Sequence, residues 1–168
     1  VFSKGITPRA YFPMDEEHPT FAEDAYSQGK WIGEQMGEGF VRRRPGEVQI
    51  ASMRFHGLMD RDHQAALNAA DERHGAYGTN AMHFWGWTDF AEAARACVLA
   101  IEVDFGGHEA FFINSEDTSA DEPTEELIKK VYPEAEIRSP MPGHTSAISV
   151  EKAKRILGWK PKVTWRDA

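Results

Sequence analysis

The fold class of this chain is decided by one stretch, Val48-Gln49-Ile50-Ala51-Ser52-Met53-Arg54-Phe55. Its apolar and β-branched content predicts a strand. The Pro45-Gly46 pair before it predicts a turn, and a helix is expected ahead of that turn, from a cap at Asp24 to about Val41. Helix, turn and strand in this order are typical of α/β proteins, in which helices alternate with the strands of a largely parallel sheet.

The middle of the chain continues this alternation. Residues 61–73 suit a helix, and the aromatic stretch from Met82 to Trp87 is expected to be extended. A further helix is expected to begin at Thr88 or Asp89. Apolar residues recur along it at helical spacing and are expected to face the core, namely Phe90, Ala94, Cys97, Val98 and Ile101.

The two ends of the chain differ in their expected structure. Residues 3–23 hold several prolines and are expected to form a loop. Short strands near the C-terminus suggest a smaller lobe beside the main sheet. The elements expected there are a strand over 110–114, a helix from Pro123 that stops by Pro133, a short strand around Ile137, and a helix from Ser149 to Leu157 that ends at Gly158.

Size, charge and composition exclude several classes of function. The chain has 168 residues, enough for one domain with a core. Its net charge of −8 argues against a nucleic-acid-binding surface, and its only basic run, residues 42–44, falls where a helix should end and suits the helix dipole. No stretch is long and apolar enough for a membrane span, and no HExxH or CxxC spacing predicts a metal site. The single cysteine, Cys97, fits a reducing, cytoplasmic compartment.

One motif carries chemistry, the pair Tyr26 and Lys30 within the helix that is expected to begin at Asp24. Positions i and i+4 lie on one helix face, so an ammonium would lie beside the phenol. A nearby positive charge favours a phenolate, which can take a proton from a substrate hydroxyl while hydride passes to a nicotinamide. So short a motif also arises by chance, in which case Tyr26 is an exposed ring stacked on a lysine stem.

Five segments, in the family's order, resemble the extended short-chain dehydrogenase/reductases, the NAD-dependent epimerase/dehydratase family. Residues 25–30 are similar to that family's P-Y-x-x-S-K motif, with Gly29 in place of Ser or Ala. The other four segments are residues 12–19, which resemble its P-x-x-E-x-x-P loop, 52–55, which resemble x-L-R-F/Y, 84–94, which resemble F-V-H-V-D-D-V-A-x-A, and 149–161, which resemble s-x-x-K-A-x-x-x-L-G-W-x-P.

This resemblance implies an architecture and a cofactor. The chain would be the C-terminal part of a Rossmann-like, doubly wound parallel sheet, with a smaller substrate-binding lobe made mainly of residues 57–83 and 115–168. The cofactor would be NAD or NADP, and the glycine-rich turn for its pyrophosphate and the catalytic Ser or Thr would lie upstream of Val1. The isolated chain is accordingly expected to bind the dinucleotide weakly.

The resemblance also implies roles for individual residues. Tyr26 would be the catalytic acid/base, and Lys30 would bind the nicotinamide ribose, so that both also contact the cofactor. Phe55 and His56 would follow the strand that passes the nicotinamide. A homodimer through the glycine-rich helix face over residues 29–39 is a further expectation. The residues expected to contact the substrate are His56, Gly57 and Trp85.

The substrate is expected to be a small sugar-type molecule. Nucleotide-sugar members of the family usually carry an Asn and an Arg at the positions that Gly57 and Met82 occupy here. Neither residue can supply the hydrogen bonds that a diphosphate needs, which favours a free sugar or a sugar acid. A shift of the alignment by one or two residues would bring Arg54 or Arg61 into the pocket instead. A nucleotide-sugar epimerase or dehydratase, or a non-catalytic binding or regulatory module, is therefore the alternative.

Overall fold

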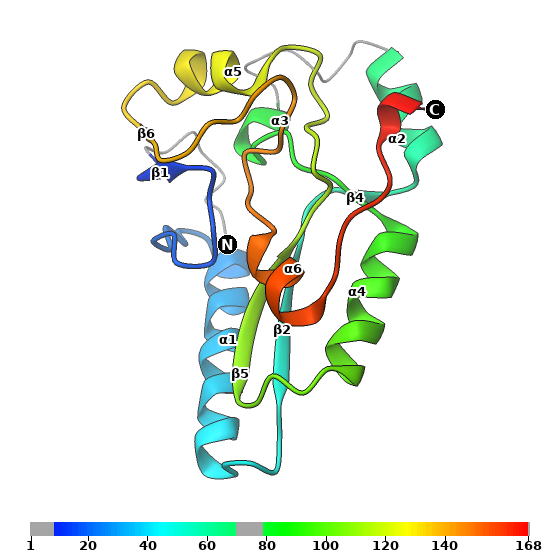
Figure 1. Cartoon of the computed structure of the whole chain (residues 1–168). Coiled ribbons are helices and arrows are strands. Elements are labelled where there is room, and N and C mark those ends of the chain that lie inside the picture. Colours follow the sequence, from blue (N-terminus) through cyan, green and yellow to red (C-terminus); the bar gives the residue numbers. More distant parts are fainter. Residues whose placement is uncertain (1–8, 70–78, 168) are drawn as a thin grey trace.

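The computed structural model describes residues 9–69 and 79–167, which form three layers (Figure 1). The central layer is a parallel pair of strands, β2 (Ile50–Phe55) and β5 (His108–Ile113), with Ile50 opposite His108 and Phe55 opposite Ile113. Helix α1 (Ala25–Arg43) covers one face of this pair, and helices α4 (Phe90–Glu102) and α6 (Glu151–Leu157) cover the other. The predicted α/β class with parallel strands is confirmed.

The two faces of the central strands differ in chemistry because side chains alternate along a strand. Arg54 and His108 point towards α1, where both meet glutamates of that helix. Phe111 and Ile113 point the other way and pack in an apolar cluster with α4 and α6. The face that α1 covers is therefore the polar one, and it is the face that forms the site described below.

The N-terminal end of α1 is fixed by its cap. The carboxylate of Asp24 accepts hydrogen bonds from the backbone N–H groups of Tyr26 and Ser27, at 2.9 and 3.0 Å, as the sequence predicted. Of the glycines within the helix, Gly37 lies closest to the sheet, since a Cβ there would be 3.2 Å from the His108 ring. No described atom lies within 4 Å of a Cβ built at Gly29, so close packing of the glycine-rich face onto this chain holds only at Gly37.

A smaller lobe lies beside these layers. Its short strands β1 (Tyr11–Phe12) and β6 (Glu136–Ile137) pair in parallel, so the loop expected over residues 3–23 contains a strand. Helix α5 (Thr124–Val131) and the rings of Phe12, Phe84 and Tyr132 fill its core. The remaining elements are β3 (Leu58–Met59), α2 (Arg61–Ala69), α3 (Thr79–Met82), β4 (Thr88–Asp89) and the 3₁₀ turn Trp165–Asp167.

The segment expected to be extended between Met82 and Trp87 is instead a tight turn. Helix α3 ends at Met82. Two residues further along the chain, Phe84 and Trp85 have positive φ angles of 56° and 54°. Left-handed backbone costs bulky residues about 1–3 kcal/mol each, so the surroundings must hold it in place. Both aromatic side chains are almost fully buried, and this burial offsets the strain. The prediction of an extended segment was wrong because the tertiary packing of two rings overrides the local preference.

The face of α4 that packs against the sheet was also predicted wrongly. The expected core stripe is exposed, with Phe90 at 55% and Ile101 at 81%, and Cys97 is exposed as well. The buried face consists of smaller side chains, Ala93, Ala96 and Ala100, together with Glu92. Alanine lets the helix axis approach β2 and α6 closely, which larger side chains would prevent. Asp89 caps the helix as expected.

Other boundaries differ by a few residues from the expectation. Strand β2 begins at Ile50 rather than Val48, and β5 begins at His108. The expected end of the helix over 61–73 lies outside the described residues. Gly158 ends α6 with φ 66°, as predicted. None of the helices in the described part is long and apolar enough to cross a membrane.

Candidate active site

A cleft of about 770 Å³ opens between the N-terminal half of α1, the end of β2 and the segment that follows α3. It brings together residues that are far apart in the sequence, from Asp24 to Phe112. Five of the six residues expected at the site line this one cleft, namely Tyr26, Lys30, Phe55, His56 and Gly57.

Tyr26 and Lys30 lie on the same face of α1, one turn apart. The Nζ atom of Lys30 is 5.4 Å from the centroid of the Tyr26 ring. The Tyr26 side chain is 70% exposed, so its hydroxyl is open to the cleft and to solvent. This geometry suits proton transfer between the phenol and a bound hydroxyl, beside a positive charge.

His56 and Gly57 form the part of the cleft wall where β2 ends. The backbone N–H of His56 donates to Thr88 Oγ1 at 3.3 Å, which ties the wall to β4. Burial lowers the pKa of His56 to about 3, so its imidazole is neutral at physiological pH. Gly57 has φ 39°, and a Cβ there would be 3.3 Å from the carbonyl oxygen of Gly86. A glycine is therefore required for this close approach.

Trp85 does not line the cleft. Its side chain is 1% exposed and belongs to the core of the smaller lobe, where its ring centroid lies 6.4 Å from that of Tyr132. The residue of this segment that does line the cleft is His83, together with Met82. The sequence does not show which side chain of this segment faces the cleft, because that depends on the turn after α3.

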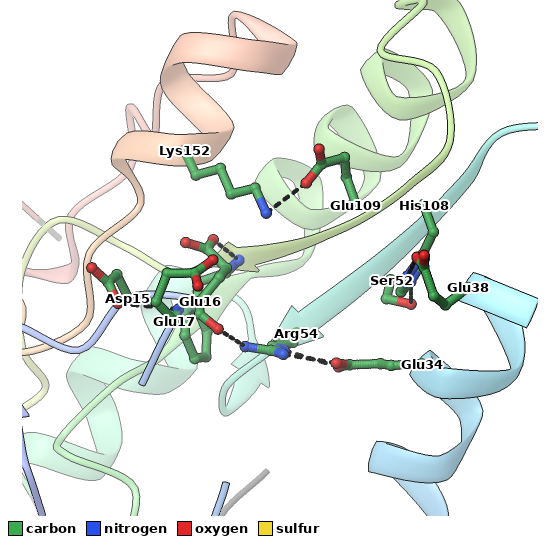
Figure 2. A network of polar contacts seen from close by, with 11 residues as sticks. Asp15, Glu16, Glu17, Glu34, Glu38, Ser52, Arg54, His108, Glu109 and Lys152 are labelled. Atoms are coloured by element: carbon green, nitrogen blue, oxygen red, sulfur yellow. Dashed lines mark hydrogen bonds and ion pairs between the residues drawn. The ribbon is translucent and has the colours of Figure 1, made fainter. Parts of the chain in front are cut away.

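A paired arginine forms another part of the cleft wall (Figure 2). Arg54 donates from Nε and Nη2 to the two carboxylate oxygens of Glu34, at 2.9 and 2.7 Å. Its guanidinium also lies 5.1 Å from the Phe112 ring centroid. Burial alone would lower the pKa of Arg54, but the hydrogen bonds and charge of Glu34 raise it, and Arg54 in turn lowers the pKa of Glu34. Arg54 therefore lines the pocket as a neutralised ion pair, whereas Arg61 does not line it.

Glu34 was not recognised from the sequence. It follows Lys30 by four residues and Tyr26 by eight, so helical spacing alone places the three on one face. The partner on β2 could not be inferred from spacing, because it depends on how α1 crosses the sheet.

Further along α1, a second set of polar contacts attaches the helix to the sheet (Figure 2). Ser52 Oγ and His108 Nε2 form a hydrogen bond of 2.8 Å, and His108 Nδ1 lies 3.5 Å from Glu38 Oε2. On the neighbouring loop, the carboxylate of Glu16 accepts from the backbone N–H of Phe112 at 2.7 Å. The contact of His108 with Glu38, together with the Arg54–Glu34 pair, holds α1 on the sheet and with it Tyr26 and Lys30.

The charges of the cleft nearly cancel. Arg54 and Glu34 neutralise each other, and Asp24 is engaged as the cap of α1. Lys30 is thus the one cation lining the cleft that forms no ion pair with another described residue. Within residues 9–69 and 79–167, no group of three His, Cys, Asp or Glu side chains could hold a metal ion.

Comparison with known proteins identifies the fold of this chain. No protein-family model and no curated protein matches the chain. Solved structures match it over nearly its whole length at low identity. The UDP-glucose 4-epimerase of Bifidobacterium longum, solved with NAD+ and UDP, matches with a TM-score of 0.59 and 18% identity, over 95% of this chain and 56% of that one. MoeE5, solved with UDP-glucuronic acid and NAD, gives 0.60 and 18%, over 98% and 59%.

A third match names the class. A short-chain dehydrogenase/reductase superfamily protein from Agrobacterium tumefaciens, solved with bound NAD, gives a TM-score of 0.59 and 18% identity, over 96% of this chain and 60% of that one. The chain thus has the fold of part of the Rossmann-type short-chain dehydrogenase/reductases, and among them it is similar to NAD-dependent nucleotide-sugar epimerases. It spans a little over half the length of the proteins it matches.

Proposed function

We propose that this chain is the C-terminal part of an NAD(P)-dependent oxidoreductase or epimerase that acts on a hydroxyl of a sugar or sugar derivative. The observation that carries the proposal is the placement of Tyr26 and Lys30 on one face of α1, in the same cleft as Phe55, His56 and Gly57. The fold shared with solved NAD-bound proteins supports it.

The side chains in the cleft fit a nicotinamide nucleoside. The Lys30 ammonium offers three donors, which suit ribose hydroxyls, and it lies over the exposed Tyr26 ring. NAD or NADP, when bound, would supply the acceptor or donor of hydride. Tyr26 would take the proton of the substrate hydroxyl on oxidation and return it on reduction, and Lys30 would stabilise the charge that forms on the phenol oxygen. Phe55 and His56, where β2 ends, would exclude water from the reacting carbon.

For the substrate, we favour a free sugar or a sugar acid. A diphosphate needs several cationic or strong N–H donors, and Arg54 is already held by both oxygens of Glu34. Lys30 alone could balance one carboxylate. The second candidate is a nucleotide-sugar epimerase or dehydratase, which the similarity to proteins solved with UDP or UDP-glucuronic acid favours.

We also propose that two copies of the protein pair through α1. Its outward face carries exposed apolar side chains at helical spacing, Ile32, Met36 and Phe40, each at least half exposed. Gly29 lies along this face and Gly33 lies at its border with the cleft, and neither has a described neighbour within 4 Å of a Cβ built there. A second α1 could approach closely at these glycines and bury the apolar stripe against itself. Sedimentation of the full-length protein should show a dimer that Met36→Glu dissociates, whereas Ile101→Glu on α4 should leave it intact.

The substrate assignment is tested on the full-length protein by following both NAD(P)H formation and the sugar products, separated by chromatography, with a panel of substrates. Product analysis is needed because an epimerase or dehydratase returns the hydride to the sugar and forms no net NAD(P)H. The panel contains hexoses, hexuronic acids and UDP- and dTDP-sugars. We expect kcat/KM to be greatest for a free sugar or sugar acid. A kcat/KM for a nucleotide sugar well above that for every free sugar would establish the second candidate. Turnover of none of them would favour a non-catalytic role.

A further inference from the structure

The segment after α3 presents one imidazole to the cleft. The His83 side chain is exposed to solvent and lines the same cleft as Tyr26 and Lys30. No other residue in the described ranges forms a hydrogen bond or ion pair with its ring. Its ring nitrogens are therefore open to a ligand that enters the cleft and replaces water there.

The backbone fixes the position of His83. Its carbonyl oxygen accepts from the N–H of Gly86 at 3.0 Å, and the N–H of Phe84 donates to Ala81 at 3.0 Å. The left-handed residues Phe84 and Trp85 follow it, with side chains 0% and 1% exposed. At Gly86 a Cβ would lie 2.7 Å from Asn114 Oδ1, so only glycine fits there. Strained backbone that the surrounding packing holds in place is found where a side chain must be presented in one orientation.

Partial desolvation in the cleft favours the uncharged form of this imidazole. Burial lowers the pKa of His83, and the neighbouring His56, which lines the same cleft, is also neutral because burial lowers its pKa to about 3. A neutral imidazole has one N–H donor and one acceptor nitrogen. A hydroxyl group, which both donates and accepts, is its natural complement, whereas a phosphate offers only acceptors.

We propose that His83 is a substrate-binding residue, whose ring exchanges a hydrogen bond with a hydroxyl of the sugar in the cleft. The assignment rests on the proposed function and deepens it, because it names the group that recognises the polyhydroxylated part of the substrate. Tyr26 and Lys30 act at the hydroxyl that reacts, and His83 holds a hydroxyl that does not.

The test is a binding experiment, so that it does not depend on turnover. The imidazole nitrogens of the full-length protein, ¹⁵N-labelled at histidine and saturated with NAD+, are observed by NMR. D-glucuronate, D-glucose and UDP-glucose are titrated separately. His83→Phe removes the ring nitrogens, and His83→Gln keeps a donor and an acceptor. His63→Phe is the matched control, because His63 is exposed on α2 and does not line the cleft.

We expect at least one of the three probes to shift the His83 resonances saturably. The Kd of that probe should rise about tenfold in His83→Phe, the size of one hydrogen bond, and less in His83→Gln. His63→Phe should change it by less than about twofold. The proposal is overturned if none of the probes shifts these resonances or if Kd is unchanged in His83→Phe. If the sugar binds through His83 but Tyr26→Phe keeps normal turnover, the assignment of His83 is supported and the proposed catalytic role of Tyr26 is contradicted.

Discussion

Two pairs of side chains line the cleft and differ in whether their polar groups are paired within the protein. Tyr26 and Lys30 both lie on α1, whereas Glu34, one turn further along α1, pairs with Arg54 of β2. Tyr26 and Lys30 are open, and the Tyr26 side chain is 70% exposed. Glu34 and Arg54 are closed on each other, with side chains only 12% and 18% exposed. The same helix thus presents unpaired groups where a ligand can reach them and paired groups where the helix meets the sheet. The open pair is available for chemistry, and the closed pair holds the helix that carries it.

The largest expected effect on activity follows substitution in the open pair, Tyr26 and Lys30. Lys30→Ala in the full-length protein should lower kcat by about 10² to 10⁴, because the charge that assists proton transfer is lost. It should also weaken cofactor binding by about tenfold or more, the size of a hydrogen bond to a charged group. Steady-state kinetics with the preferred substrate and titration with the cofactor measure both. Lys129→Ala, on the exposed surface of α5, is the control and should change neither.

Substitution in the closed pair, Glu34 and Arg54, should lower the free energy of unfolding. Glu34→Ala leaves the Arg54 guanidinium partly buried without its partner and should cost about 3 kcal/mol in the free energy of unfolding. Urea unfolding of the full-length protein measures it. The exposed pair Arg44–Glu47 offers a control, since Glu47→Ala should cost less than about 1 kcal/mol. Equal costs for the two substitutions would contradict the distinction between a closed and an exposed pair.

The closed pair should also make the free energy of unfolding depend on pH in the acidic range. Arg54 lowers the pKa of Glu34 in the folded protein, so the stabilisation is present above the unfolded-state pKa and is lost as pH falls through the folded one. The difference in unfolding free energy between the wild type and Glu34→Gln should therefore shrink below about pH 4. A difference in unfolding free energy that grows as the pH falls would contradict the lowered pKa of Glu34.

The smallest effect distinguishes two glycines of α1. Gly29→Ala meets open space and should stabilise the monomer by up to about 1 kcal/mol, the helix-propensity difference between the two residues. At Gly37 the new Cβ would be 3.2 Å from the His108 ring, so the same substitution should gain less or destabilise. Thermal unfolding at dilute protein concentration compares the two, and equal gains would argue against close contact of α1 with the sheet at Gly37.

The parts that the sequence predicted well are local ones. The Asp24 cap, the pairing of Tyr26 with Lys30 on one helix face and the stop at Gly158 each depend on residues within one or two turns. The clustering of Phe55 with Tyr26 was expected only from the family resemblance. It needs the crossover from α1 to β2, which no local pattern specifies.

The parts that the sequence missed depend on packing between distant elements. Arg54 was expected in the pocket only if the alignment shifted by one or two residues, and its pairing with Glu34 depends on the fit of α1 to β2. Trp85 was assigned to the substrate, yet the turn after α3 places it in the core and presents His83 instead. On α4, helical spacing identified an apolar stripe but not which face the sheet would take.

The central claim is that the phenol of Tyr26 serves chemistry and not structure. Tyr26→Phe removes one exposed oxygen and keeps the ring, so turnover and stability can be measured on the same full-length variant. We expect kcat to fall by about 10² to 10⁴, with cofactor affinity unchanged and the free energy of unfolding within about 0.5 kcal/mol of the wild type. Near-normal kcat on the preferred substrate would contradict the account.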